Sequence, residues 1–256
     1  MKNIIITSFL LFIVSLNLLA SEKKDFITMR DISNAEASYK AEKNVKLITA
    51  QDSMQLLPKG KAVGFDIDST LLFIEFMFRK VNEKFAGKYE NIYSNKEVWD
   101  YIYNNKLDQE YSFLKLTVSN LLIEYLNQGV DVYLITNRPK HENDEQLYQL
   151  IVKLLKDKGL KDSSKLHDII HAKNLDGSHS MKSEYKSSKT IYLKEKNIGL
   201  YYGDSDGDLL SSQEANIQSI RVMRNTLVSQ EGHEKKSPHY NPGTIGNEVI
   251  LLGSDY

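Results

Sequence analysis

The sequence predicts an α/β fold built on a doubly wound, mostly parallel sheet, and two observations carry that prediction. Four apolar segments of strand length lie at residues 61–67, 130–136, 198–204 and 218–224. None of them alternates cleanly between apolar and polar residues, which is typical of parallel strands that are covered on both faces. Helical patterns lie between them, and strands that alternate with helices indicate βαβ units.

Two of the intervening segments carry an apolar stripe at helical spacing, and each stripe is followed by a glycine that ends the helix. The first stripe consists of Leu114, Val118, Leu121, Leu122 and Tyr125, before Gly129. The second consists of Leu147, Leu150, Ile151, Leu154 and Leu155, before Gly159.

The distance between the first and second strands is much longer than one crossover helix needs, at about sixty residues. The excess, about residues 74–113, is rich in aromatic side chains. We expect a small inserted cap here, and a long decorated loop is the alternative. Residues 177–189 and 229–243 have the composition of surface loops.

The N-terminal part of the chain divides into two segments. Residues 1–20 contain an early lysine followed by an almost unbroken apolar run that ends at Ala20, as in a secretory signal peptide. An uncleaved membrane anchor is the alternative, because the run approaches the length of a bilayer span. Residues 21–57 form an N-terminal arm with a weak helical pattern over 32–48. The main domain is expected over 58–256.

Composition excludes several function classes. The 256-residue chain has a net charge of −1, so no overall basic field favours nucleic acid as a partner. There are no cysteines, which excludes disulfides, thiolate metal sites and cysteine nucleophiles. Once the signal peptide is removed, no other run is long enough to span a membrane.

Polar side chains follow three of the predicted strands at the point where each strand ends. The first strand ends in Asp66-Ile-Asp-Ser-Thr70, the second in Thr136-Asn-Arg138, and the third in Gly203-Asp-Ser-Asp-Gly-Asp208. Ligands of open α/β sheets bind beyond the carboxyl ends of the strands, so these groups are expected to converge. Converging carboxylates repel one another unless a cation joins them. Mg²⁺ suits oxygen ligands that share the ion with substrate phosphate.

These motifs resemble those of a known superfamily. "FDIDST", "ITNR", a later lysine and "YYGDSDGD" look like the four motifs of the haloacid dehalogenase (HAD) superfamily of phosphohydrolases. More closely, "AVGFDIDSTLLF", "YYGDSDGDLL" and the terminal "GNEVILLGSDY" resemble the class B bacterial acid phosphatases. The similarity runs with gaps from about residue 47 to the end of the chain.

The resemblance implies roles for the first two motifs. Asp66 matches the nucleophile that forms an aspartyl-phosphate, and Asp68 matches the general acid and base, whose backbone carbonyl also binds the metal in this family. Thr136 and Asn137 match the segment that binds the phosphoryl group. Arg138 follows in the same loop, and its planar fork is able to hold the phosphate or another part of the substrate.

The last two motifs complete the implied site. Lys189 is expected to neutralise Asp66 and the transferring phosphoryl group, and Lys186 is the alternative for that lysine. Asp204 matches a side-chain metal ligand. Asp208 matches the second acidic residue of its motif, which supports the water shell of the metal.

Three positions depart from the family pattern without replacing a catalytic group. The family usually has Asp at Ser69, Gly at Asn137 and Asn at Gly207. Asn tolerates positive φ, so Asn137 is expected to allow a tight turn. Gly207 adds backbone freedom.

Aromatic side chains are candidates for a pocket beside the phosphate. By resemblance, Phe78, Trp99 and Tyr240 could stack on a nucleoside base or a phenyl ring. Packing in the core of the cap is the alternative for each of them.

Two other metal-site patterns do not fit the sequence. An EF-hand calcium loop that began at Asp204 would need glycine and glutamate where Leu209 and Ala215 stand. The histidines His167, His171 and His179 lack the spacing of a metal site.

The sequence therefore predicts a phosphoric monoester hydrolase. The expected protein is a secreted, Mg²⁺-dependent, non-specific acid phosphatase that acts on small phosphomonoesters, nucleotides included. The resemblance further implies a homotetramer in the periplasm or at the cell surface. A phosphotransferase or specific nucleotidase on the same scaffold, and a non-catalytic surface binding module, are the alternatives.

Overall fold

The structure is a computed structural model, and it describes residues 45–89, 95–174, 176, 178–181, 184–224, 242–243 and 245–254. The chain divides into two compact units, residues 1–43 and 44–256, and all the described residues belong to the second unit. The predicted signal peptide, most of the predicted arm, and Tyr240 lie outside the described residues.

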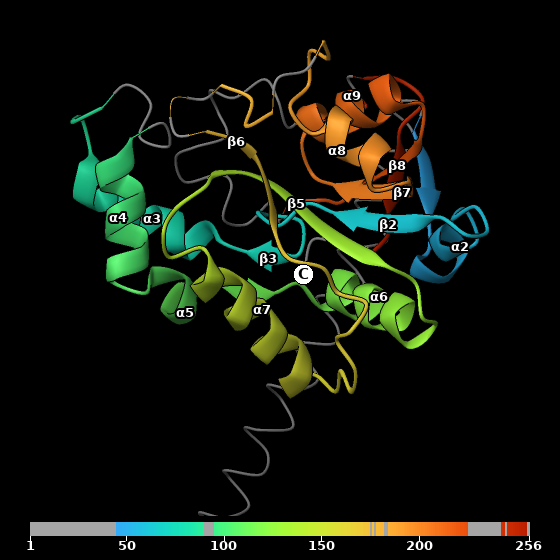
Figure 1. Cartoon of the computed structure of the whole chain (residues 1–256), viewed down its shortest axis with the longest axis horizontal. Helices are drawn as coiled ribbons and strands as arrows, with labels where there is room; N and C mark the ends of the chain where they lie inside the picture. Colours follow the sequence, from blue (N-terminus) through green and yellow to red (C-terminus); the bar gives the residue numbers. More distant parts are fainter. Residues whose placement is uncertain are drawn as a thin grey trace, which may run out of the picture. The chain divides into compact units, whose positions relative to one another are not determined.

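Seven strands of the described chain form one parallel sheet in the order β1-β9-β8-β7-β2-β5-β6 (Figure 1). They are β1 (Lys46–Ile48), β2 (Ala62–Phe65), β5 (Val132–Pro139), β6 (Ile170–Lys173), β7 (Ile198–Gly203), β8 (Gln218–Arg221) and β9 (Val249–Leu251). The predicted α/β sheet is confirmed, and β2 and β7 lie side by side at its centre.

Helices cover both faces of this sheet (Figure 1). The helices of one face are α2 (Ala50–Met54), α6 (Leu116–Asn127) and α7 (Glu145–Asp157), and those of the other are α8 (Thr190–Glu195) and α9 (Asp206–Ala215). The core divides in the same way. Val63 and Leu200 of the central strands pack with α6 and α7, whereas Tyr201 packs with α8 and α9. Strands buried on both faces explain why the sequence shows apolar runs without alternation.

The predicted cap is present between β2 and β5. It contains β3 (Leu72–Phe73), α3 (Glu75–Phe85), α4 (Lys96–Asn104), α5 (Leu107–Tyr111) and β4 (Phe113–Leu114). β3 and β4 form an antiparallel pair that brings the two ends of the insert together. Its helices bury an apolar side that includes Met77, Val81 and Ile102.

The edges of the sheet differ from the sequence prediction. The helical pattern over 32–48 is wrong at its end, because Lys46–Ile48 forms the edge strand β1, in parallel register with Val249–Leu251. β6 and β9 were not predicted, and they have only four and three residues. Among the described residues, no helix combines the length and apolar character needed to cross a bilayer.

Candidate active site

The end of β2 presents the first acidic residue to the site. Asp66 directly follows the strand, and its peptide N–H donates a hydrogen bond of 2.8 Å to the carbonyl of Tyr202 in β7. The chain then turns tightly, with the peptide N–H groups of Leu71 and Leu72 both donating to the carbonyl of Ile67. Ser69 has a left-handed backbone (φ 58°), a conformation that Asp and Asn adopt more readily than Ser.

The end of β7 presents the second acidic pair. Asp204 follows the strand, and Ser205 begins helix α9 in a capping box with Asp208. The Ser205 hydroxyl and peptide N–H both donate to Asp208 Oδ2, at 2.7 and 3.1 Å. The cap thereby holds the Asp208 side chain in a fixed orientation at the end of the sheet.

Three carboxylates converge where these two strand ends meet. Asp66, Asp204 and Asp208 are buried, and each offers an oxygen within 4.8 Å of the others. The hydroxyl of Thr70 lies 3.1 Å from Asp66 Oδ2 and 3.1 Å from Asp204 Oδ1, so it can donate to either. Carboxylates from two separate strands thus share one small volume, as the sequence predicted.

Lys189 is placed between two of these carboxylates. Its Nζ lies 2.5 Å from Asp66 Oδ1, 2.6 Å from Asp208 Oδ1, and 3.0 Å from the hydroxyl of Tyr201. The side chain of the alternative lysine, Lys186, is exposed, and its peptide N–H bonds Glu214. Lys189 is therefore the lysine of this cluster.

Burial and charge shift the pKa values of the cluster. Burial raises the pKa of Asp66 well above its usual range; Lys189 opposes this effect, while the neighbouring carboxylates add to it. Burial alone would lower the pKa of Lys189, but Asp208 and Asp66 outweigh it and raise that pKa well above normal. Lys189 is therefore a cation at every physiological pH.

Asp204 has its own cationic neighbour. Burial would raise the pKa of Asp204, but the ion pair with Arg224 and the charge of Lys115 bring it below its ordinary value. Lys115, itself buried, donates to the carbonyls of Ser69 and Met223. On the far side, Arg221 donates to the main-chain carbonyl of Asp204 at 2.8 Å.

The donor set fits a hard divalent cation. The converging groups are all oxygen donors, which Mg²⁺, Ca²⁺ and Mn²⁺ prefer. Both oxygens of Asp208 already accept protein hydrogen bonds, whereas Asp66 Oδ2 and Asp204 Oδ1 share a single hydroxyl donor. A cation beside Asp66 would also stabilise its ionised form, which burial disfavours.

The second predicted motif lies on β5, next to β2. Thr136 is buried, and its Oγ1 accepts a 3.1 Å bond from the peptide N–H of Arg138. Asn137 is exposed, and its Oδ1 accepts a 2.7 Å bond from Ser188, the residue before Lys189. The expected tight turn at Asn137 is wrong, because the residue lies within the strand. The pairing of β5 with β6 shifts register there, a bulge that redirects side chains.

Arg138 is directed at two carboxylates. Its Nε and Nη2 donate to Asp68, the latter at 2.6 Å, and its Nη1 and Nη2 donate to Asp108 of cap helix α5 at 2.8 and 3.0 Å. The ring of Trp99 lies 5.7 Å from the guanidinium carbon. The predicted contact of Arg138 with substrate stays a prediction.

The other predicted residues lie farther from the carboxylates or inside the protein. Trp99 is buried in the cap core, and Phe78 is half-buried against the same core. His171 contacts Asp144 and the carbonyl of Arg138, and His167 pairs with Asp131.

Sequence reasoning missed three residues that hold the site together, which are Arg224, Lys115 and Asp108. It placed Thr70 among the polar groups at the end of the first strand but gave it no role. Arg224 ends the predicted segment 218–224, whereas Lys115 and Asp108 lie in a stretch without a chemical motif.

Comparisons with known proteins agree with this geometry. The family described as "HAD superfamily, subfamily IIIB (Acid phosphatase)" matches residues 15–228. A class B acid phosphatase of Marinomonas sp. (strain MWYL1) is 34% identical over 216 residues, which cover 83% of this chain and 81% of that protein. One from Citrobacter rodentium (strain ICC168) is 30% identical over 195 residues, covering 76% and 73%.

A solved structure of a predicted phosphoglycolate phosphatase from Haemophilus somnus 129PT has a TM-score of 0.47 and 14% identity, covering 76% of this chain and 95% of that one. That likeness is too distant to carry an argument. The family match spans most of the chain, and the curated relatives align over most of their own length. The chain therefore belongs to the class B acid phosphatases of the HAD superfamily and is a phosphomonoesterase.

Proposed function

We propose that this phosphatase is secreted, depends on Mg²⁺, and hydrolyses a broad range of small organic phosphomonoesters, nucleotides included. The observation that carries the proposal is the placement of Asp66. One of its oxygens pairs with Lys189, and the other faces Thr70 and Asp204. A carboxylate that attacks phosphorus is repelled by the negative phosphoryl oxygens. The positive charge of Lys189 beside Asp66 reduces this repulsion.

In the first step, an oxygen of Asp66 attacks the phosphorus atom while the ester P–O bond breaks. Asp68 donates its proton to the departing oxygen, so an alcohol leaves and an aspartyl-phosphate remains. Lys189 stabilises the negative charge on the phosphoryl oxygens. Thr136 supplies a further donor, because its oxygen already accepts from the peptide of Arg138 and its own proton is free to point elsewhere.

In the second step, Asp68 removes a proton from a water molecule as that water attacks the aspartyl-phosphate. The bond between phosphorus and Asp66 breaks, inorganic phosphate leaves, and both aspartates return to their starting states. Asp68 is the more accessible of the two, with a side-chain exposure of 22% against 8% for Asp66. This difference suits a residue that exchanges protons with alcohol and water.

Mg²⁺ would be held by the side chains of Asp66 and Asp204 and by the main-chain carbonyl of Asp68, with Asp208 supporting its water shell. When bound, it would supply positive charge for the phosphoryl oxygens. Trp99 packs in the core of the cap, so Phe78 on the cap and Tyr240 are the proposed apolar contacts for the organic part of the substrate. Asn137 and Arg138 are the proposed polar ones.

The direct test is hydrolysis of p-nitrophenyl phosphate at acid pH. We expect full activity with Mg²⁺, none after treatment with EDTA, and loss of at least about 10³-fold in Asp66→Asn. Undiminished hydrolysis by Asp66→Asn would exclude Asp66 as the nucleophile. If the wild type bound phosphomonoesters without turning over any of them, a binding module would be favoured instead.

A phosphotransferase or a specific nucleotidase would use the same residues. Rates on nucleoside monophosphates, sugar phosphates and phenyl phosphates, with and without an added alcohol acceptor, separate these functions. Export is tested by fractionating cells and sequencing the N-terminus of the mature protein, which we expect to begin near Ser21. Sedimentation measurements test the proposed homotetramer.

A further inference from the structure

The guanidinium of Arg138 joins a residue of the cap to the proposed proton donor. Asp68 accepts from Nε and Nη2, and Asp108 accepts from Nη1 and Nη2, all within 3.0 Å. Arg138 and Asp108 have side-chain exposures of only 1% and 8%. Carboxylates therefore occupy two edges of the buried guanidinium, that of Asp108 inside the protein and that of the more accessible Asp68 on the other side.

The three groups come from different parts of the fold. Asp68 follows β2 and Arg138 stands on β5, both in the sheet domain, whereas Asp108 lies on α5 of the cap. The hydroxyl of Ser112 at the end of α5 donates 3.1 Å to Asp108 Oδ1, which fixes the carboxylate on its own helix. The ion pair thus transmits the position of α5 to the side chain of Asp68.

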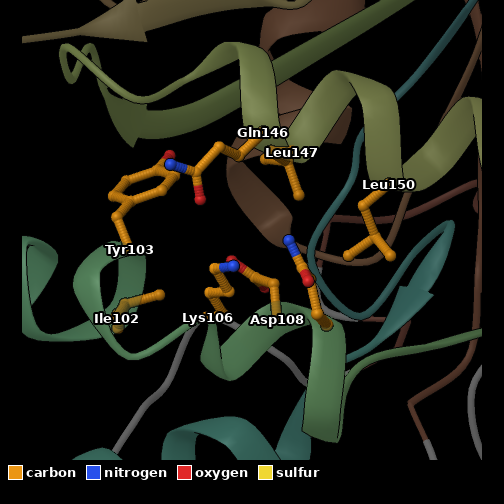
Figure 2. A pocket seen from close by; sticks show the side chains of 8 residues that line it. Ile102, Tyr103, Lys106, Asp108, Gln146, Leu147 and Leu150 are labelled. Atoms are coloured by element: carbon orange, nitrogen blue, oxygen red, sulfur yellow. The ribbon is translucent and has the colours of Figure 1, made fainter.

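Asp108 lies at the junction between the cap and the sheet domain. Figure 2 shows it on one wall of a pocket with Lys106, opposite Leu147 and Leu150 of helix α7. Lys106 begins α5 with a left-handed backbone (φ 52°), so α5 starts at a sharp change of direction. Asp108 is the member of this wall that reaches Arg138.

Burial gives the interaction its strength. Burial alone would lower the pKa of Arg138, but Asp108 and Asp68 outweigh it and raise that pKa well above its usual range. Bidentate pairs between arginine and carboxylate fix geometry as well as charge. If one of the two carboxylates is removed, the guanidinium is held on one side only and can rotate together with the carboxylate that remains.

We propose that Asp108 is a positioning residue, which holds Arg138 so that Asp68 is oriented toward the leaving oxygen of the substrate. The inference rests on the proposed role of Asp68 as proton donor. The position of the cap and the orientation of Asp68 are then coupled, because both depend on the ion pairs of Arg138.

The alternative is that the ion pair only attaches the cap to the sheet domain. Leaving groups distinguish the two roles. An alkoxide needs its proton as the P–O bond breaks, whereas p-nitrophenolate leaves without one. A misoriented Asp68 therefore slows alkyl phosphates more than p-nitrophenyl phosphate. A loosened cap, which carries the proposed aromatic contact Phe78, slows p-nitrophenyl phosphate at least as much as alkyl phosphates.

The experiment compares kcat/KM for glycerol 2-phosphate and p-nitrophenyl phosphate in wild type and Asp108→Asn. We expect kcat/KM for glycerol 2-phosphate, divided by kcat/KM for p-nitrophenyl phosphate, to fall at least about tenfold in the variant. The enzyme concentration cancels in this ratio, so a partly folded preparation still gives a valid answer. Should Asp108→Asn not fold, Asp108→Glu, which keeps the charge but moves the carboxylate, is measured in the same way.

Tyr103→Phe is the matched control. It removes another contact between cap and sheet domain, the 3.0 Å bond from Tyr103 to Asp144, and leaves the Arg138 pairs intact. The same ratio, glycerol 2-phosphate over p-nitrophenyl phosphate, should not fall in Tyr103→Phe. An unchanged ratio in whichever Asp108 variant folds, or an equal fall in Tyr103→Phe, overturns the inference.

Asp68→Asn separates this inference from the proposed function. A large fall of the ratio in Asp68→Asn with none in Asp108→Asn leaves Asp68 as the donor and overturns only the positioning role. An unchanged ratio in Asp68→Asn overturns the proton-donor role, and the inference falls with it.

Discussion

Asp208 packs against Gly203 so closely that a Cβ added to the glycine would lie 2.4 Å from the Cβ of the aspartate and 2.7 Å from its Oδ2. Real Cβ atoms do not approach other atoms this closely, so the glycine is required for the contact. Asp208 in turn holds Lys189 at 2.6 Å. Because Gly203 has no side chain, Asp208 can pack at the end of β7 and hold Lys189 beside Asp66.

Gly203→Ala should displace Asp208 and with it Lys189. We expect activity to fall about 10–100-fold, because misplacement of a catalytic group by a fraction of an ångström is costly. Overpacking should also lower the free energy of unfolding by about 1–3 kcal/mol. Rates on p-nitrophenyl phosphate and urea denaturation measure the two effects. Gly207→Ala is the control, since the nearest atom to its added Cβ is 3.6 Å away; equal losses in both variants would contradict the argument.

Lys189→Met tests the buried cation. It removes the positive charge between two buried carboxylates while keeping most of the volume. Activity should fall at least about 100-fold, and the metal-free protein should lose roughly 3–5 kcal/mol of stability, because the remaining carboxylates are left uncompensated. Lys186→Ala, at an exposed side chain, should match wild type in both measurements. A large effect of Lys186→Ala would reopen the choice between the two lysines.

Removal of divalent metal should destabilise the protein as well as inactivate it. A ligand that binds the folded state at 100 times its dissociation constant contributes about 2.7 kcal/mol. We therefore expect the Tm of EDTA-treated protein to rise by several degrees on addition of Mg²⁺. Asp204→Asn, which removes one proposed ligand, should show little or no rise. Equal responses of wild type and Asp204→Asn would place the metal elsewhere.

His171 should make stability depend on pH. Burial lowers its pKa below the ordinary value of 6.5, although Asp144 opposes this effect. The unfolded state therefore binds more protons between that lowered pKa and pH 6.5, and stability falls as the pH drops through this window. His171→Asn keeps a donor for the carbonyl of Arg138, and it should reduce the loss between pH 7.5 and 5.5 by up to about 1 kcal/mol.

Urea denaturation at the two pH values measures this difference. His167→Asn, at a partly exposed histidine, is the control and should not reproduce the flattening. An unchanged slope in His171→Asn would show that the histidine is protonated equally in both states.

The central sheet and the main acidic residues could be predicted because both leave local signals. Asp66 and Asp204 each directly follow an apolar run, so the strand and the acidic residue at its end are recognisable from a few adjacent residues. Asp108 left no such signal, since its role depends on a cap helix whose docking is set by tertiary packing. The same limit applies to Lys115, which the chain brings to Ser69 across 46 positions of sequence. The tight turn expected at Asn137 is absent because β5 continues through that residue to Pro139.

The pairing of β1 with β9 joins residues near the two ends of the described domain. Glu248, directly before β9, accepts a 2.7 Å bond from Arg221, which also holds the carbonyl of Asp204. A nascent chain lacks these contacts until residues 248–251 have been synthesised, well after the last acidic motif. A polypeptide truncated before residue 248 would therefore retain every acidic motif yet leave Arg221 without its glutamate.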